Sequence, residues 1–415
     1  MQVSNSNPAD LLGAPLHLPC GAVIKNRFCK SATSETLGDR RNAPTEQLVR
    51  LYRTWAEGGA GLLVTGNVMI DRRHLGEPGN VVIEDERNMN KLRSWAEAGC
   101  QNRTHIWMQL NHPGRQAPKP LSAQPVAPSA VSFRSDMARF FNPPRALSAA
   151  EIRNLIRRYA KTAGIAQKAG FTGVQIHAAH GYLVSQFLSP LTNQRTDEWG
   201  GSPGNRMRFV LRIYDAIREQ VGPDFPISIK LNSSDFMRGG LTEEESAGVA
   251  VSLAESGIDL IEISGGTYER PAMTGRTLQV GQSDCEAYFL SYAEALRTRI
   301  NTPVALTGGF RKAAGMAAAL EKNGIDMVGL ARPLVIDPEL PNRILDGEDY
   351  VSPIRPINTG IRLIDRVALL ELTWYEQQIG YLGRGRRPRP NQGAWFSLAK
   401  TLIENGFQVF QKRRG

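Results

Sequence analysis

The chain of 415 residues contains little cysteine, and its four cysteines are scattered. Cys20, Cys29, Cys100 and Cys285 include no pair separated by two residues, the spacing that often marks structural zinc, and no close cluster that could hold an iron–sulfur centre. The distribution therefore argues against a disulfide framework, an iron–sulfur cluster and a structural zinc. It is typical of a protein from a reducing compartment.

The sequence also lacks any run of about 18 apolar residues that could cross a bilayer. Its first residues, MQVSNSNPADLLG, show no basic region followed by an apolar core, so they do not read as a signal peptide. Hydrophobic residues make up 41% of the chain and charged residues 22%, which is typical of a globular enzyme. We expect a cytoplasmic protein with no membrane partner.

Most of the chain has little net charge, and an excess of positive charge occurs only at its end. Residues 351–415 hold eleven Lys and Arg against four Asp and Glu, which gives +7 of the net +10, and the first 350 residues are nearly balanced. A basic tail of this kind is more often a solvated surface than a nucleic-acid site. The sequence therefore predicts a small-molecule substrate and no nucleic-acid partner.

Eight short apolar segments alternate with amphipathic ones, as parallel strands alternate with helices. Capping boxes open two of the helical segments, at Ser148–Glu151 and Thr242–Glu245. Glycines such as Gly170 and Gly257 precede strands, where a helix is expected to end. Eight such units in about 320 residues predict an α/β fold, a (β/α)₈ TIM barrel. The predicted strands are Arg27–Ala32, Ala60–Gly66, Thr104–Leu110, Thr172–His177, Pro226–Asn232, Ile258–Ser264, Pro303–Thr307 and Ile325–Leu330.

The pattern predicts two parts, a barrel domain over residues 1–350 and a basic, helical C-terminal extension over residues 351–415. Within the extension, Ile361–Ile379 has helical spacing and is followed by a segment rich in Gly, Arg and Pro, Gly380–Pro390. We expect Trp374 and Tyr375 to pack against the barrel or a neighbouring subunit, and the protein to be a homo-oligomer.

Two histidines and a tyrosine, His177, His180 and Tyr182, follow the fourth predicted strand. Two imidazoles and a phenol at the end of a buried strand can bind a polarised oxygen and deliver a proton. A zinc site and two structural histidines are the alternatives that the spacing leaves open. No HExxH motif or close cysteine pair accompanies the histidines to favour zinc.

Other polar residues also fall at the ends of predicted strands, where barrel enzymes place their chemistry. A glycine pair, Gly308–Gly309, follows the seventh strand and Arg332 follows the eighth, an arrangement that predicts a phosphate site. Lys230 lies within the fifth strand, where it needs a carboxylate or a polarised cofactor as a partner.

The chain resembles the old yellow enzyme family of FMN-dependent NAD(P)H:flavin oxidoreductases, over about residues 9–345. The resemblance is closest to the thermophilic-like branch, which carries HAAHGYL. It rests on Lys25-Asn26-Arg27, WMQLNHPGR from Trp107, the long motif from His177 to Arg206, and GLARPLVIDPELP from Gly329.

This resemblance implies FMN as cofactor and NAD(P)H as electron donor, with no metal. Backbone and hydroxyl groups of Ser31, Ala32, Thr33 and Ser34 would hold one edge of the flavin, where relatives in this branch carry Cys in place of Ser34. Lys230, in place of the commoner Arg, would lie beside N1 and O2. The remaining implied contacts are Gly66 and Gln109 to the ring system, and Gly309, Ala331 and Arg332 to the phosphate.

The resemblance also implies a ping-pong reduction of an enone, enal or nitroalkene. His177 and His180 would bind the carbonyl or nitro oxygen, and Tyr182 would donate a proton to the α-carbon. Three other readings remain open: a flavin-dependent oxidase or isomerase of secondary metabolism, a barrel that binds flavin without turnover, and a larger relative of the dienoyl-CoA reductase or amine dehydrogenase kind. The scattered cysteines and the lack of a later GxGxxG disfavour the last of these.

Overall fold

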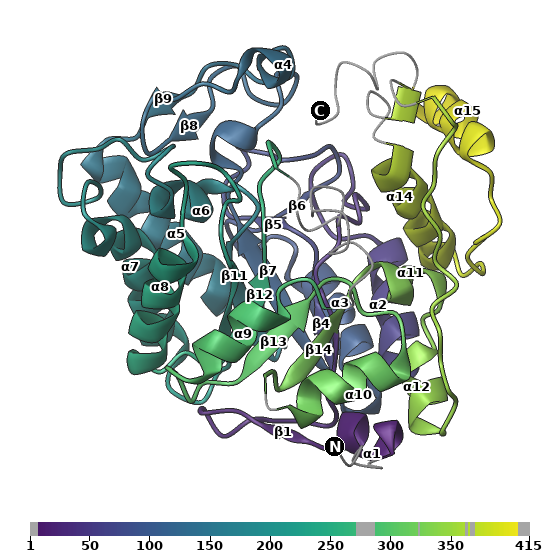
Figure 1. Ribbon diagram of the computed structural model, residues 1–415. Helices are drawn as coiled ribbons and strands as arrows, with labels where there is room; N and C mark the ends of the chain where they lie inside the picture. The colour runs from purple at the N-terminus through teal and green to yellow at the C-terminus, as the bar shows by residue number, and fades with distance from the viewer. Residues whose placement is uncertain (1–6, 271–286, 323, 362–363, 366–369, 406–415) are drawn as a thin grey trace.

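A closed barrel of parallel strands forms the centre of the molecule (Figure 1). This computed structural model describes residues 7–270, 287–322, 324–361, 364–365 and 370–405. The sheet closes because β10 pairs with both β11 and β7, and each of the eight predicted segments overlaps one barrel strand. The prediction of a (β/α)₈ barrel is therefore confirmed. The barrel strands are β3 (Phe28–Lys30), β4 (Leu62–Val64), β7 (His105–Asn111), β10 (Gly173–Ala178), β11 (Ile227–Asn232), β12 (Leu260–Ser264), β13 (Val304–Thr307) and β14 (Met327–Leu330).

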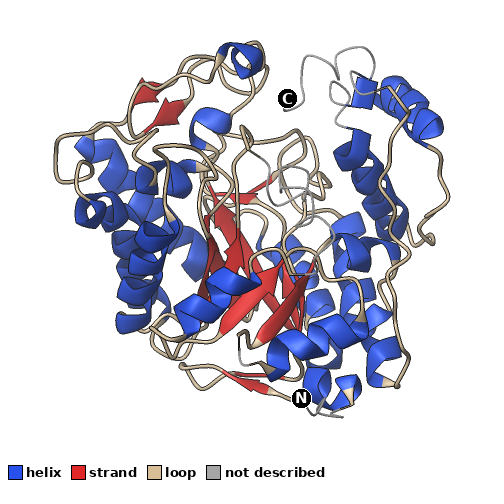
Figure 2. Ribbon diagram, in the orientation of Figure 1, coloured by secondary structure: helices blue, strands red, loops and turns tan. Residues whose placement is uncertain are grey.

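Helices surround the strands (Figure 2), and most of the apolar core lies between these two layers. The predicted capping boxes both form, at Ser148 before α5 and at Thr242 before α8. Gly170 ends α5 in the left-handed conformation, with φ of 93°, as its place before a strand predicts. The helices around the barrel are α2 (Glu46–Glu57), α3 (Met89–Gly99), α5 (Ala149–Ala169), α7 (Pro203–Val221), α8 (Glu243–Glu255), α9 (Leu290–Arg297), α10 (Ala313–Glu321), α11 (Arg332–Ile336) and α12 (Leu340–Leu345).

The barrel interior is apolar at one end and polar at the other. A short antiparallel hairpin, β1 (Leu16–His17) with β2 (Val23–Ile24), contributes to the apolar interior cluster that includes Trp107 and Met327. Gly173 leaves room for the large indole, because a Cβ there would lie 2.5 Å from Trp107. Towards the carboxyl ends of the strands the buried side chains become polar, and this end holds the residues that the sequence singles out.

Additional segments flank the carboxyl ends of the strands (Figure 1). After β7 the chain makes a long excursion over residues 112–148, and its aromatic side chains form a separate apolar cluster of Phe133, Met137, Phe140 and Phe141. Short elements in the strand-to-helix connections complete this end. They are β5 (Val68–Met69), β6 (Val81–Val82), β8 (Val126–Ala127), α4 (Ser135–Ala138), β9 (Arg145–Ala146) and α6 (Leu183–Leu188).

The C-terminal extension packs on the same chain through α14 (Leu370–Gly383), which contacts α2 and α11. Trp374 and Tyr375 are buried in the main core of this chain, at 2% and 8% exposure. The prediction that the helix ends at Ile379 is wrong. The helix continues to Gly383 because Tyr381 and Leu382 are also buried. The helix α15 (Ala394–Asn405) then packs on α14, and the last ten residues lie outside the described part.

In the described part of the chain, no helix combines the length and the apolar character that a membrane span needs.

Candidate active site

A buried carboxylate, Glu262 of β12, organises the polar end of the barrel interior. Three side chains from three other strands donate to it: Lys230 Nζ at 2.8 Å and Thr307 Oγ1 at 2.6 Å to Oε1, and Gln175 Nε2 at 2.8 Å to Oε2. Glu262 is 1% exposed and Lys230 is 3% exposed. Lys230 therefore has the carboxylate partner that its position in an apolar strand requires.

The charge of Glu262 is stabilised inside the protein. Burial opposes ionisation, but the ammonium of Lys230 and the hydrogen bonds from Lys230, Thr307 and Gln175 outweigh it, so the pKa of Glu262 lies below its ordinary value. Glu262 is therefore an ionised carboxylate at neutral pH that accepts hydrogen bonds from three side chains.

Hydrogen bonds extend from Glu262 around the barrel in both directions. Gln109 Nε2 on β7 donates to Gln175 Oε1 at 2.8 Å. On the other side, Thr307 gives its only hydroxyl proton to Glu262, so Ser31 must donate to Thr307 at 2.7 Å. Gly329 on β14 permits this contact, because a Cβ there would lie 1.9 Å from Thr307 Oγ1.

A second buried ion pair supports the segment after β3. Lys30 Nζ lies 2.9 Å from Thr33 Oγ1 and 3.4 Å from Glu35 Oε1, and 4.1 Å from the ring centroid of Trp55. Glu35 also accepts from Tyr52 at 2.6 Å and from the backbone N–H of Gly66 at 3.0 Å. Burial raises the pKa of Glu35 and lowers that of Lys30, each against the pull of its partner.

The hydroxyls expected at the flavin edge all have partners within the protein. Ser31 bonds to Thr307, Thr33 accepts from Lys30, and Ser34 Oγ donates to both oxygens of Glu77 at 2.9 and 2.8 Å. Gly66 lies close to this segment, since a Cβ there would be 2.3 Å from the carbonyl oxygen of Thr33. The hydroxyls thus fix the shape of residues 31–34, which leaves the backbone of this segment as its candidate for contacting a ligand.

The predicted histidine pair and tyrosine lie together at the end of β10. The ring centroids of His177 and His180 are 5.2 Å apart, and His177 lies 4.7 Å from the ring of Tyr182. His177 Nδ1 accepts from the backbone N–H of Ala179, so the proton of the neutral ring is on Nε2. His180 Nε2 lies 2.8 Å from Ser264 Oγ.

The backbone turn after β10 places His180 in an unusual conformation. Its φ is 60°, a left-handed value that non-glycine residues rarely adopt. Its N–H donates to Asn232 Oδ1 at 3.2 Å, and it forms an isolated parallel bridge with Thr267 after β12. The contacts with Asn232 of β11 and with Thr267 after β12 hold the backbone of His180 in this conformation, which sets the direction of its imidazole.

The Tyr182 hydroxyl has two polar neighbours that sequence analysis did not assign. Asn67 Nδ2 donates to it at 3.2 Å, and the hydroxyl of Tyr268 lies 2.6 Å away. Tyr268 follows β12, and its ring packs against the aromatic cluster of the excursion. Nearby, Arg115 pairs with Glu269 at 2.6 Å and lies 4.2 Å from the Phe133 ring centroid, which fixes the excursion over the site.

The residues predicted to bind a phosphate occupy the ends of β13 and β14. Gly308 and Gly309 have φ values of 133° and 89°, and a Cβ on Gly309 would lie 2.9 Å from the backbone nitrogen of Ala287. Ala331 and Arg332 begin α11. Arg332 Nη1 donates to Glu371 Oε1 at 2.6 Å, so the extension reaches this part of the barrel.

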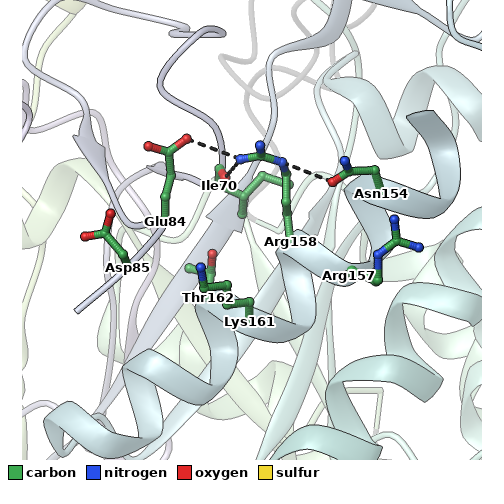
Figure 3. Close-up of a pocket in the computed structure, with 8 residues that line it drawn as sticks. All are labelled: Ile70, Glu84, Asp85, Asn154, Arg157, Arg158, Lys161 and Thr162. Atoms are coloured by element: carbon green, nitrogen blue, oxygen red, sulfur yellow. Dashed lines mark hydrogen bonds and ion pairs between the residues drawn. The ribbon is translucent and has the colours of Figure 1, made fainter. Parts of the chain in front are cut away.

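The hollow shown in Figure 3 is a separate feature on the outside of the barrel. It measures about 370 Å³ and lies between α5 and the segment that follows β6. Its central Arg158 already bonds Glu84 at 3.2 Å and Asn154 at 3.3 Å. None of the residues that line the hollow belongs to the histidine and tyrosine cluster.

Sequence analysis missed Glu262 and Glu35, although a signal for each was present. Glu262 is the charged residue in the apolar strand LIEIS, and Glu35 follows the strand FCK at the predicted catalytic end. Among the residues that the structure describes, no three or more His, Cys, Asp or Glu side chains lie together so that they could hold a metal ion.

Comparison with known proteins gives a family match over almost the whole barrel. Residues 12–349 match the NADH:flavin oxidoreductase / NADH oxidase family. The NADH-dependent flavin oxidoreductase iccE of Talaromyces variabilis is 38% identical over 363 residues, which cover 81% of this chain and 87% of that protein. The protein iliE of a Neonectria species is also 38% identical, over 360 residues and 80% of this chain, but the chain spans only 47% of its length.

Among solved structures, an old yellow enzyme homologue from Zymomonas mobilis aligns with a TM-score of 0.70 and 26% identity. The alignment covers 83% of this chain and 94% of that one.

Replacing Lys230 by Met should strongly destabilise the fold, because the buried Glu262 carboxylate would lose its cation. We expect the free energy of unfolding to fall by about 3–5 kcal/mol at neutral pH, and the added change Glu262→Gln to restore part of the loss. Urea denaturation at a fixed FMN concentration measures both. The double variant must be more stable than Lys230→Met, and equal stabilities would contradict the assignment.

The difference in unfolding free energy between the wild-type protein and Lys230→Met should depend on pH. The folded-state pKa of Glu262 is lowered, so the stability that the pair contributes is complete above the ordinary glutamate pKa of about 4.3 and is lost as the pH falls through the lowered folded value. The loss caused by Lys230→Met should therefore shrink on acidification into this range.

Proposed function

The chain belongs to the NADH:flavin oxidoreductase / NADH oxidase family, an FMN enzyme family with NAD(P)H as electron donor, and we propose that it reduces the activated C=C bond of α,β-unsaturated carbonyl or nitro compounds. One observation carries the proposal. His177, His180 and Tyr182 meet at the carboxyl end of the barrel, with ring separations of 4.7 and 5.2 Å.

The residues around this cluster fit the cofactor of the family. The glycine pair at 308–309 leaves its backbone open to a phosphate, where a side chain would collide with Ala287. Arg332 adds a guanidinium at the end of the next strand. The remaining contacts in this proposal come from the backbone of Ser31–Ser34 and from Gly66, Gln109, Lys230 and Ala331.

Lys230 suits the electron-rich edge of a flavin for a specific reason. Its ammonium has three donors, and one of them is used by Glu262. The paired carboxylate fixes the position of the ammonium, so the lysine would lie where negative charge develops on the bound flavin. When bound, FMN supplies the hydride that the double bond accepts at its β-carbon.

The protein's own side chains then act on the substrate oxygen and the α-carbon. His177 carries its proton on Nε2 and donates it as a hydrogen bond to the carbonyl or nitro oxygen, with His180 beside it. This withdraws electron density from the β-carbon. Tyr182 is neutral at pH 7 and still holds its proton, so it can protonate the α-carbon. NAD(P)H and the substrate would bind at this end of the barrel in turn, as a ping-pong mechanism requires.

Tyr182→Phe tests the reaction directly, because it keeps the ring and removes the acid. NAD(P)H oxidation should proceed, whereas flavin reoxidation by cyclohexenone should slow by roughly 10²–10⁴. A nitroalkene should be affected less, since a nitronate can leave unprotonated. Stopped-flow absorbance follows both half-reactions.

The matched control is Tyr214→Phe, which removes a hydroxyl that donates to Ser256 on the outer helices. Failure of the wild-type protein to reoxidise with any enone or nitroalkene would overturn the proposed function and favour an oxidase or isomerase role. A wild-type rate for Tyr182→Phe would assign the proton to another donor.

The histidine pair should determine the affinity for phenols, which present an enolate-like oxygen. Loss of one charge-assisted hydrogen bond costs roughly 1.5–3 kcal/mol, so His177→Ala and His180→Ala should each weaken phenol binding about tenfold or more. Spectral titration measures this, with His17→Ala, an exposed residue, as control. Unchanged binding in both variants would refute the assignment.

Arg332→Ala should weaken FMN binding about tenfold or more, since a guanidinium–phosphate contact is also charge-assisted. Quenching of flavin fluorescence by the apoprotein gives the dissociation constant. Arg153→Ala removes an exposed arginine of α5 and serves as control. If both variants bind FMN equally, the phosphate lies elsewhere.

A further inference from the structure

Tyr182 is poorly placed to recover a proton by itself. Its side chain is buried, at 3% exposure, beneath the segment that follows β12. If it protonates a substrate carbon, as the proposed function requires, it must regain one proton in every turnover. A buried phenolate exchanges protons with bulk water only through a neighbouring group that can carry them.

Tyr268 provides such a neighbour. Its hydroxyl lies 2.6 Å from that of Tyr182, and the two rings meet edge to face with centroids 5.8 Å apart. Tyr268 is partly exposed, in contrast to Tyr182. The pair therefore links the buried hydroxyl to a residue whose side chain is partly exposed.

Asn67 also contacts the hydroxyl of Tyr182. Its amide nitrogen donates to the Tyr182 oxygen at 3.2 Å. A hydroxyl oxygen can accept two hydrogen bonds. Either hydroxyl of the Tyr182–Tyr268 pair can donate to the other, so a proton can pass between the two oxygens in either direction.

The structure also fixes Tyr268 in place. Thr267 and Arg270 bond to each other through both backbone pairs, at 2.9 and 3.1 Å, so Tyr268 and Glu269 form the centre of a tight turn. Thr267 bridges to His180, and Glu269 pairs with Arg115. The turn is thus tied to the histidine pair on one side and to the excursion after β7 on the other.

We propose that Tyr268 is a proton-relay residue that restores the proton of Tyr182. The inference rests on the proposed function, because it needs Tyr182 as donor. In the balanced sequence the Tyr182 O–H bond breaks as the α-carbon C–H bond forms. The Tyr268 proton then moves to the Tyr182 oxygen, and Tyr268 takes a proton from water. No further oxidant or reductant takes part.

The test separates the first turnover from later ones. Tyr268→Phe keeps the ring in the aromatic cluster and removes the relay proton. Reoxidation of pre-reduced enzyme by an enone should keep its rate within about twofold in a single turnover, because Tyr182 starts protonated. Steady-state turnover should fall on the order of tenfold, which is less than the roughly 10²–10⁴ expected for loss of the acid itself, because water can slowly replace the relay. Added imidazolium buffer should restore it.

Two comparisons make the result decisive. With a nitroalkene, whose nitronate product can leave unprotonated, Tyr268→Phe should lose less of its steady-state turnover than with an enone. Tyr268→His, which keeps an exchangeable proton, should retain more enone turnover than Tyr268→Phe.

An unchanged steady-state rate in Tyr268→Phe would overturn the relay. So would a loss that buffer does not rescue, or a first turnover as slow as that of Tyr182→Phe. If Tyr182→Phe itself reoxidises normally, the proposed donor fails, and that outcome is distinct from failure of the relay alone.

Discussion

The buried carboxylate of Glu262 is the constraint on which the polar half of the barrel depends. An ionised carboxylate at 1% exposure is tolerated only if its partners replace water on nearly every side. Lys230, Gln175 and Thr307 do so from three different strands. Gln175 and Thr307 each form one further side-chain hydrogen bond. The positions of Gln109 and Ser31 follow from this requirement, because they complete the bonds of Gln175 and Thr307.

This arrangement separates two tasks within one barrel. The apolar interior around Trp107 and Met327 supplies burial at the amino ends of the strands. The polar layer towards the carboxyl ends of the strands buries less apolar surface, but it provides hydrogen-bond donors in fixed positions. Lys30 and Glu35 form the second buried ion pair, between the barrel and α2. Glu35 also accepts from the N–H of Gly66, which holds the segment after β3 in place. The two buried ion pairs therefore shape the site from inside and from outside the barrel.

Most of the fold, and part of the site, follow from local sequence features. Near-continuous apolar segments and capping boxes predict the strands and helix starts because their causes lie within a few residues. The cluster of His177, His180 and Tyr182 follows for the same reason. Contacts such as Glu262 with Lys230 and Tyr268 with Tyr182 could not be predicted, because they depend on the register in which distant strands meet. The contact of Arg332 with Glu371 depends on where the extension folds back, which no local pattern specifies.

Exclusion of water has opposite consequences for the two kinds of group at this end of the barrel. A low local dielectric strengthens the attraction between Glu262 and Lys230, and this attraction, together with the hydrogen bonds, outweighs the cost of burying the charge of Glu262. In the proposed reaction Tyr182 would have to lose a proton and regain it, and burial alone would isolate it from solvent. A protein that excludes water from its fixed charges would then need a separate route between its acid and solvent. The edge-to-face pair of Tyr182 and Tyr268 is the connection that we propose for this role.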